Sequence, residues 1–101
     1  MTHRLIRYRI SPDHADRNDQ LVRDVLAELQ ARNAGSVRYL VLRGTDGTFL
    51  HLVASEPGKD ASSITTLPAF QEFQRGHRER CLEPPQVIEV TVVGNHRMLA
   101  D

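Results

Sequence analysis

The stretch 67-LPAFQEFQRGHRERCLEPPQVIEVTVVG-94 decides the fold, because it joins an amphipathic helix to an alternating strand. A helix is predicted at about residues 66–81, and four of its side chains share one narrow arc at 3.6 residues per turn: Phe70, Phe73, His77 and Cys81. The charged residues of the segment largely point elsewhere. An imidazole is therefore expected inside the apolar stripe of this helix.

Two prolines end the predicted helix. Pro84 and Pro85 cannot continue it, because proline lacks the backbone N–H and clashes with the preceding turn. Residues 86–93 then alternate, with Ile88, Val90 and Val92 on one face. This two-residue period predicts a strand.

The N-terminal third predicts a strand followed by a helix. Residues 4–10, RLIRYRI, alternate and place Ile6, Tyr8 and Ile10 on one face. Ser11-Pro12-Asp13 then favours a helix start, and an apolar stripe continues over residues 12–33. Asn33-Ala34-Gly35 is expected to stop this helix.

Two β-rich runs lie in the middle of the chain, at residues 36–43 and 48–54. Gly44-Thr45-Asp46-Gly47 separates them and suits a short hairpin turn, so they are expected to pair antiparallel. The polar residues 55–62 read as a linker within the domain.

The element order strand, helix, strand, strand, helix, strand predicts an α+β fold, the ferredoxin-like βαββαβ sandwich. Right-handed crossovers place the first and third strands in the middle of a four-stranded antiparallel sheet. One domain is expected over residues 1–101, with its core at about 3–94 and a C-terminal tail at 95–101.

The two faces of the sheet differ in their chemistry. Three purely apolar sets are expected under the helices: Ile6, Tyr8 and Ile10; Leu50, Leu52 and Ala54; Ile88, Val90 and Val92. The second strand could turn either Val37, Tyr39 and Val41 or Arg38, Leu40 and Leu42 to the other face. That other face mixes apolar residues with charge, among them Leu5, Phe49, Val53, Arg7, Arg9, His51 and Glu89. A symmetric partner packed sheet to sheet would cover it, so a homodimer with a part-polar cavity is predicted.

Composition excludes several classes of protein. The 101 residues hold 13 Lys and Arg against 13 Asp and Glu, a formal net charge of +0, so no global field attracts nucleic acid or an anionic membrane. Cys81 is the one cysteine, which excludes an intramolecular disulfide framework, and the N-terminal residues contain no long apolar segment. We expect a soluble, cytoplasmic protein that binds neither nucleic acid nor membrane.

The element order, the opening LIRYRISPDHADRNDQLV, the hairpin and the helix LPAFQEFQRGHRERC resemble the antibiotic biosynthesis monooxygenase (ABM) superfamily of dimeric α+β barrels. The resemblance spans about residues 3–94. It implies the dimeric barrel. It also implies a plausible oxygenase, since the superfamily contains cofactor-free quinone-forming oxygenases, haem-degrading enzymes and members without a known reaction.

The same resemblance aligns His77 with the histidine that ligates haem in the haem-degrading members. Those enzymes also use an Asn on the first strand and a Trp before the second helix. Here the first strand reads RLIRYRI, and the chain contains no Trp. Haem is therefore the weaker alternative, and no cofactor is expected. His77 and Cys81 are spaced like two metal ligands, but no further ligand cluster accompanies them, so no metal is expected either.

The candidate catalytic residues are His77 and His51, each of which could titrate near neutral pH. The candidate substrate-binding residues are Arg7, Arg9, Tyr39, Phe70, Phe73 and Glu89. Structural roles compete with these assignments: a histidine in an apolar stripe is commonly a hydrogen-bonded core residue, and Arg7, Arg9 and Glu89 could form cross-strand ion pairs.

Two functions remain open from the sequence. One is a small cofactor-independent monooxygenase that acts on an aromatic or quinol-like molecule. The other is a non-catalytic ligand-binding or structural α+β barrel.

Overall fold

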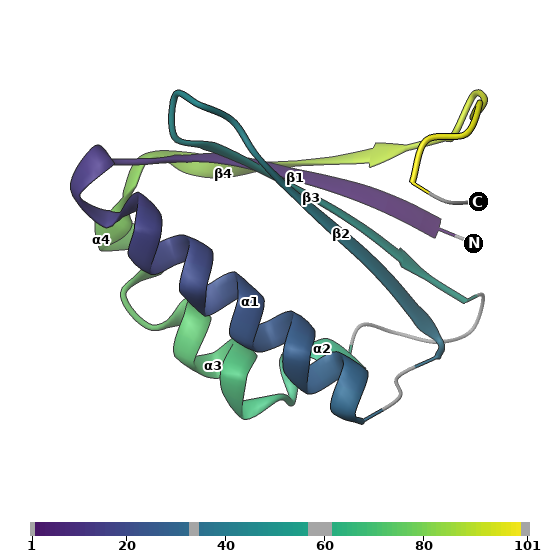
Figure 1. Cartoon of the computed structure of the whole chain (residues 1–101), viewed down its shortest axis with the longest axis horizontal. Helices are drawn as coiled ribbons and strands as arrows, with labels where there is room; N and C mark the ends of the chain where they lie inside the picture. Colours follow the sequence, from purple (N-terminus) through teal and green to yellow (C-terminus); the bar gives the residue numbers. More distant parts are fainter. Residues whose placement is uncertain (1, 33–34, 57–61, 100–101) are drawn as a thin grey trace.

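A four-stranded antiparallel sheet bears helices on one face in the computed structural model of the protein, which describes residues 2–32, 35–56 and 62–99 (Figure 1). The strands are β1 (Thr2–Ile10), β2 (Val37–Arg43), β3 (Thr48–Ser55) and β4 (Cys81–Val90). Their order in the sheet is β2-β3-β1-β4. This confirms the predicted ferredoxin-like arrangement with the first and third strands in the middle.

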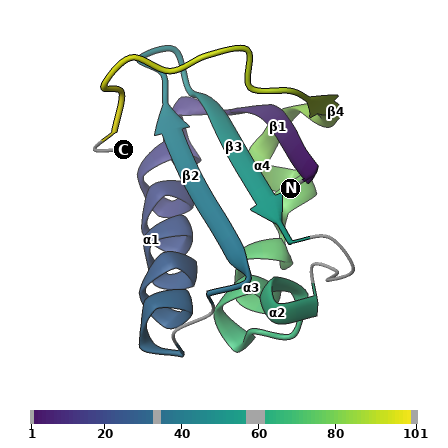
Figure 2. The same cartoon turned by 90° about the vertical axis from the view of Figure 1, so that its right-hand side faces the viewer.

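The helical layer consists of a long helix and three short ones. A 3₁₀ turn, Pro12–His14, leads into α1 (Ala15–Ala31). The C-terminal half contributes α2 (Ser62–Thr65), α3 (Pro68–Gln74) and α4 (His77–Arg80). Figures 1 and 2 both show α1 and α3 side by side beneath the sheet. No helix in residues 2–32, 35–56 and 62–99 is long and apolar enough to cross a membrane.

The second predicted helix is interrupted, so the prediction of one helix over 66–81 was wrong. Gly76 adopts the left-handed conformation, with φ 72°, and Arg75 before it is extended. Glycine reaches positive φ without the Cβ clash that other residues suffer, which allows the chain to turn between α3 and α4. His77 therefore begins a new helix, and Cys81 belongs to β4.

The last strand begins at Cys81 and ends at Val90, instead of the predicted 86–93. It contains Pro84 and Pro85, which were expected to lie outside it. An edge strand tolerates proline, because one side of its backbone needs no ladder partner. The pairing of β4 with β1 also shifts register between Arg7 and Arg9.

The hairpin turn between β2 and β3 is confirmed. The amide of Gly44 donates to the carbonyl of Thr48 at 2.7 Å, and the amide of Thr48 donates to Oδ1 of Asp46 at 2.9 Å. Gly47 has φ 90° and lies against the end of β1, where its carbonyl accepts from the amide of Ile10 at 2.9 Å. Two other predicted features extend beyond the described residues: the linker at 57–61 and the helix stop at 33–34.

The strand register corrects the predicted faces of β3 and β4. Tyr8 lies opposite Phe49, and Ile6 lies opposite His51 and Val87. Directly opposed residues share a face, so Phe49, His51 and Val53 point toward the helices, whereas Leu50, Leu52 and Ile88 point away. The prediction failed because both faces of β3 carry apolar side chains, which leaves its two-residue period ambiguous.

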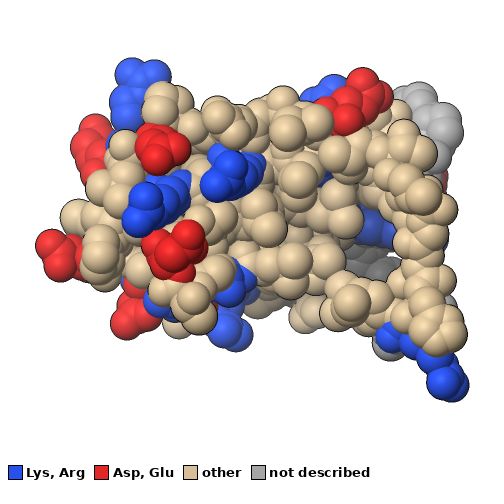
Figure 3. Space-filling view, turned by 90° about the horizontal axis from the view of Figure 1, so that it is seen from above, with Lys and Arg blue, Asp and Glu red and all other residues tan. Residues whose placement is uncertain are grey.

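The register also settles the orientation of β2. Tyr39 lies opposite Val53 and therefore faces the helices, whereas Leu40 lies opposite Leu52 on the other face. A single row of apolar residues consequently crosses the open face from strand to strand: Leu40, Leu52, Leu5 and Ile88. Figure 3 looks down on this face, where charged side chains gather toward one end and an uncharged area covers the middle.

Candidate functional site

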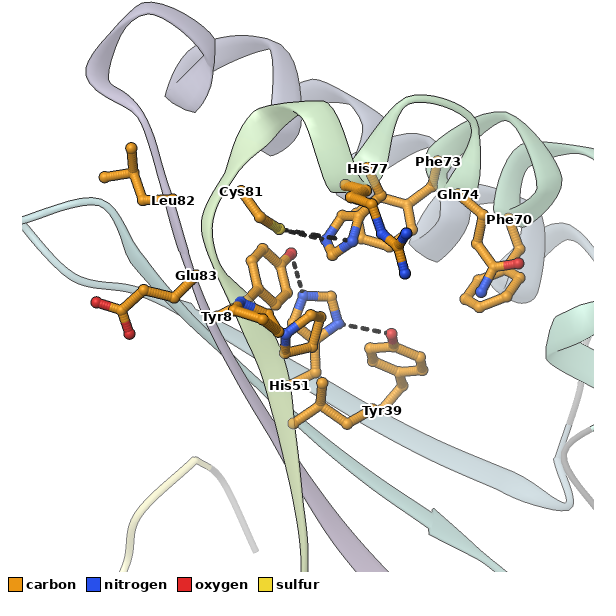
Figure 4. A pocket seen from close by; sticks show the side chains of 14 residues that line it. Tyr8, Tyr39, His51, Phe70, Phe73, Gln74, His77, Cys81, Leu82 and Glu83 are labelled. Carbon is orange, nitrogen blue, oxygen red and sulfur yellow. Dashed lines mark hydrogen bonds between the residues drawn. The ribbon is translucent and has the colours of Figure 1, made fainter.

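A cavity of about 750 Å³ lies between the helix-bearing face of the sheet and the α3–α4 segment. Six side chains with aromatic rings contribute to its wall: Tyr8, Tyr39, His51, Phe70, Phe73 and His77 (Figure 4). Strand alternation points the first three inward from β1, β2 and β3. One turn of α3 separates the two phenylalanines, and the Gly76 turn presents the histidine.

His51 lies between two tyrosine hydroxyls. Its Nε2 is 2.7 Å from the hydroxyl of Tyr8, and its Nδ1 is 2.7 Å from the hydroxyl of Tyr39. The imidazole and Tyr8 are both only 3% exposed. Both nitrogens of this histidine therefore have partners within the protein.

Asn18 and Arg80 continue the polar chain beneath the cavity. The amide nitrogen of Asn18 donates to the hydroxyl of Tyr8 at 3.0 Å, and Nε of Arg80 donates to Oδ1 of Asn18 at 3.3 Å. The remaining guanidinium nitrogens donate to the carbonyls of Arg75 at 2.9 Å and Phe73 at 2.6 Å. A buried arginine thus holds the end of α3 and, through Asn18, the end of the polar chain.

Burial sets the protonation states in this chain. The pKa of His51 falls to about 4, because burial disfavours the imidazolium and the nearby His77 adds to the effect. Burial raises the pKa of Tyr39 to about 12 and raises that of Tyr8 further. At neutral pH the imidazole of His51 is therefore neutral, and the hydroxyls of Tyr8 and Tyr39 keep their protons.

His77 has weaker partners. Its ring lies 4.6 Å from that of Tyr8 and 4.9 Å from that of Phe73 between centroids. Each of its nitrogens is 3.6 Å from the sulfur of Cys81, a weak contact. Burial, followed by the charge of Arg80, lowers the pKa of His77, so its neutral form is favoured. A neutral imidazole that borders the cavity and makes no strong hydrogen bond to the described residues is equipped to accept a proton.

Five of the predicted site residues meet at this cavity: His77, His51, Tyr39, Phe70 and Phe73. The other three lie elsewhere. Arg7 and Arg9 are exposed on the outward-facing side of β1, where Nε of Arg9 donates to the carbonyl of Asp46 at 3.3 Å. Glu89 lies on β4, opposite Arg4. The inward face of β1 presents Tyr8 to the cavity instead.

Sequence reasoning missed Asn18 and Arg80. Asn18 is 0% exposed and lies on the apolar stripe of α1, one turn before Leu21 and Val22, so its polarity within that stripe was a usable signal. Arg80 gave no comparable signal. Its burial depends on the break at Gly76, which helical periodicity does not reveal.

No group of three or more His, Cys, Asp or Glu side chains lies close enough to hold a metal ion in residues 2–32, 35–56 and 62–99. Within those described residues, His77 and Cys81 have no further ligand of these types beside them.

Comparisons with known proteins agree with the fold. No protein-family model and no curated protein sequence matches the chain. The solved structure named "Putative antibiotic biosynthesis monooxygenase from Nitrosomonas europaea" superposes with a TM-score of 0.74 at 14% identity, covering 93% of this chain and 100% of that one. A second structure, described as an antibiotic biosynthesis monooxygenase, gives 0.69 at 15% identity with the same coverage.

A third solved structure, Rv0793 from Mycobacterium tuberculosis, gives a TM-score of 0.65 at 15% identity, covering 93% of this chain and 96% of that one. At these identities the similarity is one of fold. The ferredoxin-like α+β fold of the single chain is thereby confirmed, and the chemistry depends on the cavity itself.

Proposed function

We propose that this protein is a small cofactor-independent monooxygenase that oxidises a flat phenolic or quinol-like molecule in the aromatic cavity. The observation that carries the proposal is the position of His77 in a wall that also contains Tyr8, Phe70 and Phe73. Its imidazole is neutral and makes no strong hydrogen bond within the part of the protein that the structure describes. Aromatic walls bind flat rings by stacking and by apolar burial. The named neighbours with this fold support the same class of reaction.

In the proposed reaction the protein moves a proton and the substrate supplies the electrons. His77 accepts a proton from a phenol or from the acidic carbon beside a ketone, which leaves an electron-rich anion. That anion reduces dioxygen, and one oxygen atom bonds to the ring carbon as a peroxide. Loss of water from the peroxide gives the quinone, so a methylene group and O₂ become a carbonyl group and H₂O. No external reductant is needed.

A second copy of the chain belongs to this proposal. The row of Leu40, Leu52, Leu5 and Ile88 gives the open sheet face an apolar centre. Large apolar side chains are also exposed on β4, with Leu82 at 54% and Val87 at 62%. Association of two open faces would remove the leucine and isoleucine row from water, whereas Val87 lies opposite Ile6 on the helix-bearing side.

The alternative function is a non-catalytic ligand-binding barrel. The arrangement around His51 favours it, because both ring nitrogens are occupied and the residue is buried like a structural histidine. In that case the cavity holds an aromatic ligand without turnover.

Oxygen consumption separates the two functions. The purified protein is mixed with a panel of quinols, polycyclic phenols and anthrone-type ketones, and dioxygen uptake is followed with an electrode. Wild type and the surface control His14→Gln should turn over, and His77→Gln should lose at least tenfold in rate while still binding. Saturable binding without uptake for every compound would favour the non-catalytic barrel.

Haem binding is the third alternative, and the residues that accompany the histidine ligand in haem-degrading enzymes are missing. β1 carries no Asn, and the sequence contains no Trp. We expect a haem titration to give no saturating, histidine-ligated Soret band. A band that saturates at one haem per subunit and vanishes in His77→Gln would restore the haem reading.

A further inference from the structure

The buried chain from Arg80 through Asn18, Tyr8 and His51 to Tyr39 contains groups that can each donate or accept. The direction in which these hydrogen bonds are donated therefore decides whether Tyr39, the last residue of the series, donates to a ligand or accepts from it. Heavy-atom distances alone do not show the direction, but the chemistry at one end does.

Arg80 determines the orientation of Asn18. A guanidinium only donates, so the atom of Asn18 that lies 3.3 Å from Nε of Arg80 must be the carbonyl oxygen. The amide nitrogen then faces Tyr8 and donates to its hydroxyl oxygen at 3.0 Å. In the first two hydrogen bonds, the residue nearer the arginine is therefore the donor.

The proton of Tyr8 determines the next link. This hydroxyl is buried, and its partners among the described residues are Asn18 and His51. Asn18 uses a donor there and cannot accept. The hydroxyl proton is satisfied only if it is donated to Nε2 of His51, because the reverse arrangement would leave a buried donor unpaired.

His51 must then carry its own proton on Nδ1. Burial keeps the ring neutral, so one nitrogen accepts and the other donates. Nδ1–H donates to the hydroxyl of Tyr39 at 2.7 Å. Tyr39 is half-buried at the cavity wall and retains an O–H that no described residue accepts.

We propose that this chain is polarised in one direction and makes Tyr39 a donor that binds an anionic oxygen of the ligand, a phenolate or an enolate. The inference deepens the proposed function, and it names the substrate class as molecules whose oxygen becomes negative when His77 removes a proton. The chain begins at a positive charge. Among the ion pairs formed by the described residues, none involves Arg80, which is 7% exposed. Donors aligned from a buried cation are preorganised for an anion.

The tautomer of His51 tests the direction without any ligand. In protein labelled with ¹⁵N-histidine, the two ring nitrogens of a neutral imidazole have well-separated shifts, and we expect the proton on Nδ1. Asn18→Asp should reverse the chain, because a carboxylate accepts from both Arg80 and Tyr8, which forces the His51 proton to Nε2. Gln20→Glu adds the same charge on the exposed face of α1 and should leave the tautomer unchanged. An Nε2–H tautomer in the wild type overturns the proposal.

Binding of 4-nitrophenolate tests the consequence for ligands. Tyr39→Phe keeps the ring and removes the donor, so affinity for the phenolate should fall roughly ten- to hundredfold, the range for a hydrogen bond to a charged group. The uncharged 4-nitroanisole should bind the variant and the wild type about equally. Equal phenolate affinity in both proteins overturns the proposal. Failure of oxygen uptake with intact phenolate selectivity would remove the monooxygenase and leave the donor site standing.

Discussion

At the scale of single residues, His51 links the stability of the protein to pH. Its pKa is about 4 in the folded protein, against about 6.5 for an unfolded chain. The unfolded state therefore binds a proton that the folded state refuses, and the stabilisation present above pH 6.5 is lost as the pH falls toward 4. The full effect is about 3 kcal/mol, and His77 contributes in the same direction.

The measurement is a urea titration at pH 7.5 and at pH 5, at one protein concentration. Wild type should lose about 2 kcal/mol of unfolding free energy between the two more than His51→Gln does, because glutamine does not titrate. His51→Gln should also be less stable at pH 7.5, since it cannot serve both tyrosines as the imidazole does. Equal losses in the two proteins would mean that His51 is protonated in the folded state near its ordinary pKa.

At the scale of elements, two glycines shape the connections that build the site. Gly47 has φ 90°, and a Cβ there would lie 2.6 Å from the carbonyl oxygen of Ile10. Gly76 has φ 72°, but its nearest neighbour would be the guanidinium of Arg80 at 3.7 Å, an ordinary van der Waals contact. Gly94 has neither a positive φ nor a neighbour within 4 Å. The three positions therefore differ in strain and in clash.

Substitution by alanine should rank these positions. Gly76→Ala should cost about 1–2 kcal/mol from its left-handed backbone alone. Gly47→Ala should cost more, because the clash with a backbone atom adds to the strain, and Gly94→Ala should change stability by less than about 0.5 kcal/mol. Chemical unfolding of the three variants gives the order. A Gly76→Ala variant as stable as wild type would show that the break between α3 and α4 does not need positive φ at that position.

The elements also show where sequence reasoning reaches its limit. The two faces of β1 were predicted correctly, because Ile6, Tyr8 and Ile10 form one apolar face and the other face is less apolar. The two faces of β3 were predicted the wrong way round. Phe49 and Val53 are as apolar as Leu50 and Leu52, so only the pairing register shows which pair faces the helices. Local periodicity carries no information about register when both faces are apolar.

Prediction of the site also succeeded where the signal is local in sequence and failed where it is not. Phe70 and Phe73 reached the cavity as expected, because they lie one turn apart on α3, and His77 reaches it through the two-residue break at Arg75 and Gly76. The chain of Asn18, Tyr8 and His51 was not predicted, because its links join residues 10 and 43 positions apart. Hydrogen bonds between distant segments leave no local pattern to read.

At the scale of the whole molecule, the open face of the sheet carries apolar side chains at its centre. Leu40, Leu52, Leu5 and Ile88 form a continuous row across it, and Leu42 is 50% exposed in the next row. A stable interface buries about 1,200 Å² or more in total, and apolar residues at its centre favour association. We therefore expect a homodimer of about twice 11.4 kDa by light scattering at micromolar concentration.

Leu52→Lys should separate the subunits, because β3 is a central strand and its open-face side chain would lie near the middle of the interface. In a monomer the new ammonium group reaches water at little cost, so the fold should persist with an unchanged circular dichroism spectrum. In a dimer the same group would be buried without a partner, at a cost of several kcal/mol in each subunit. Ala27→Lys, on the exposed side of α1, introduces the same ammonium group away from the sheet and should remain dimeric. A Leu52→Lys variant that still scatters as a dimer would place the interface elsewhere, and the exposed residues of β4 would become the next surface to alter.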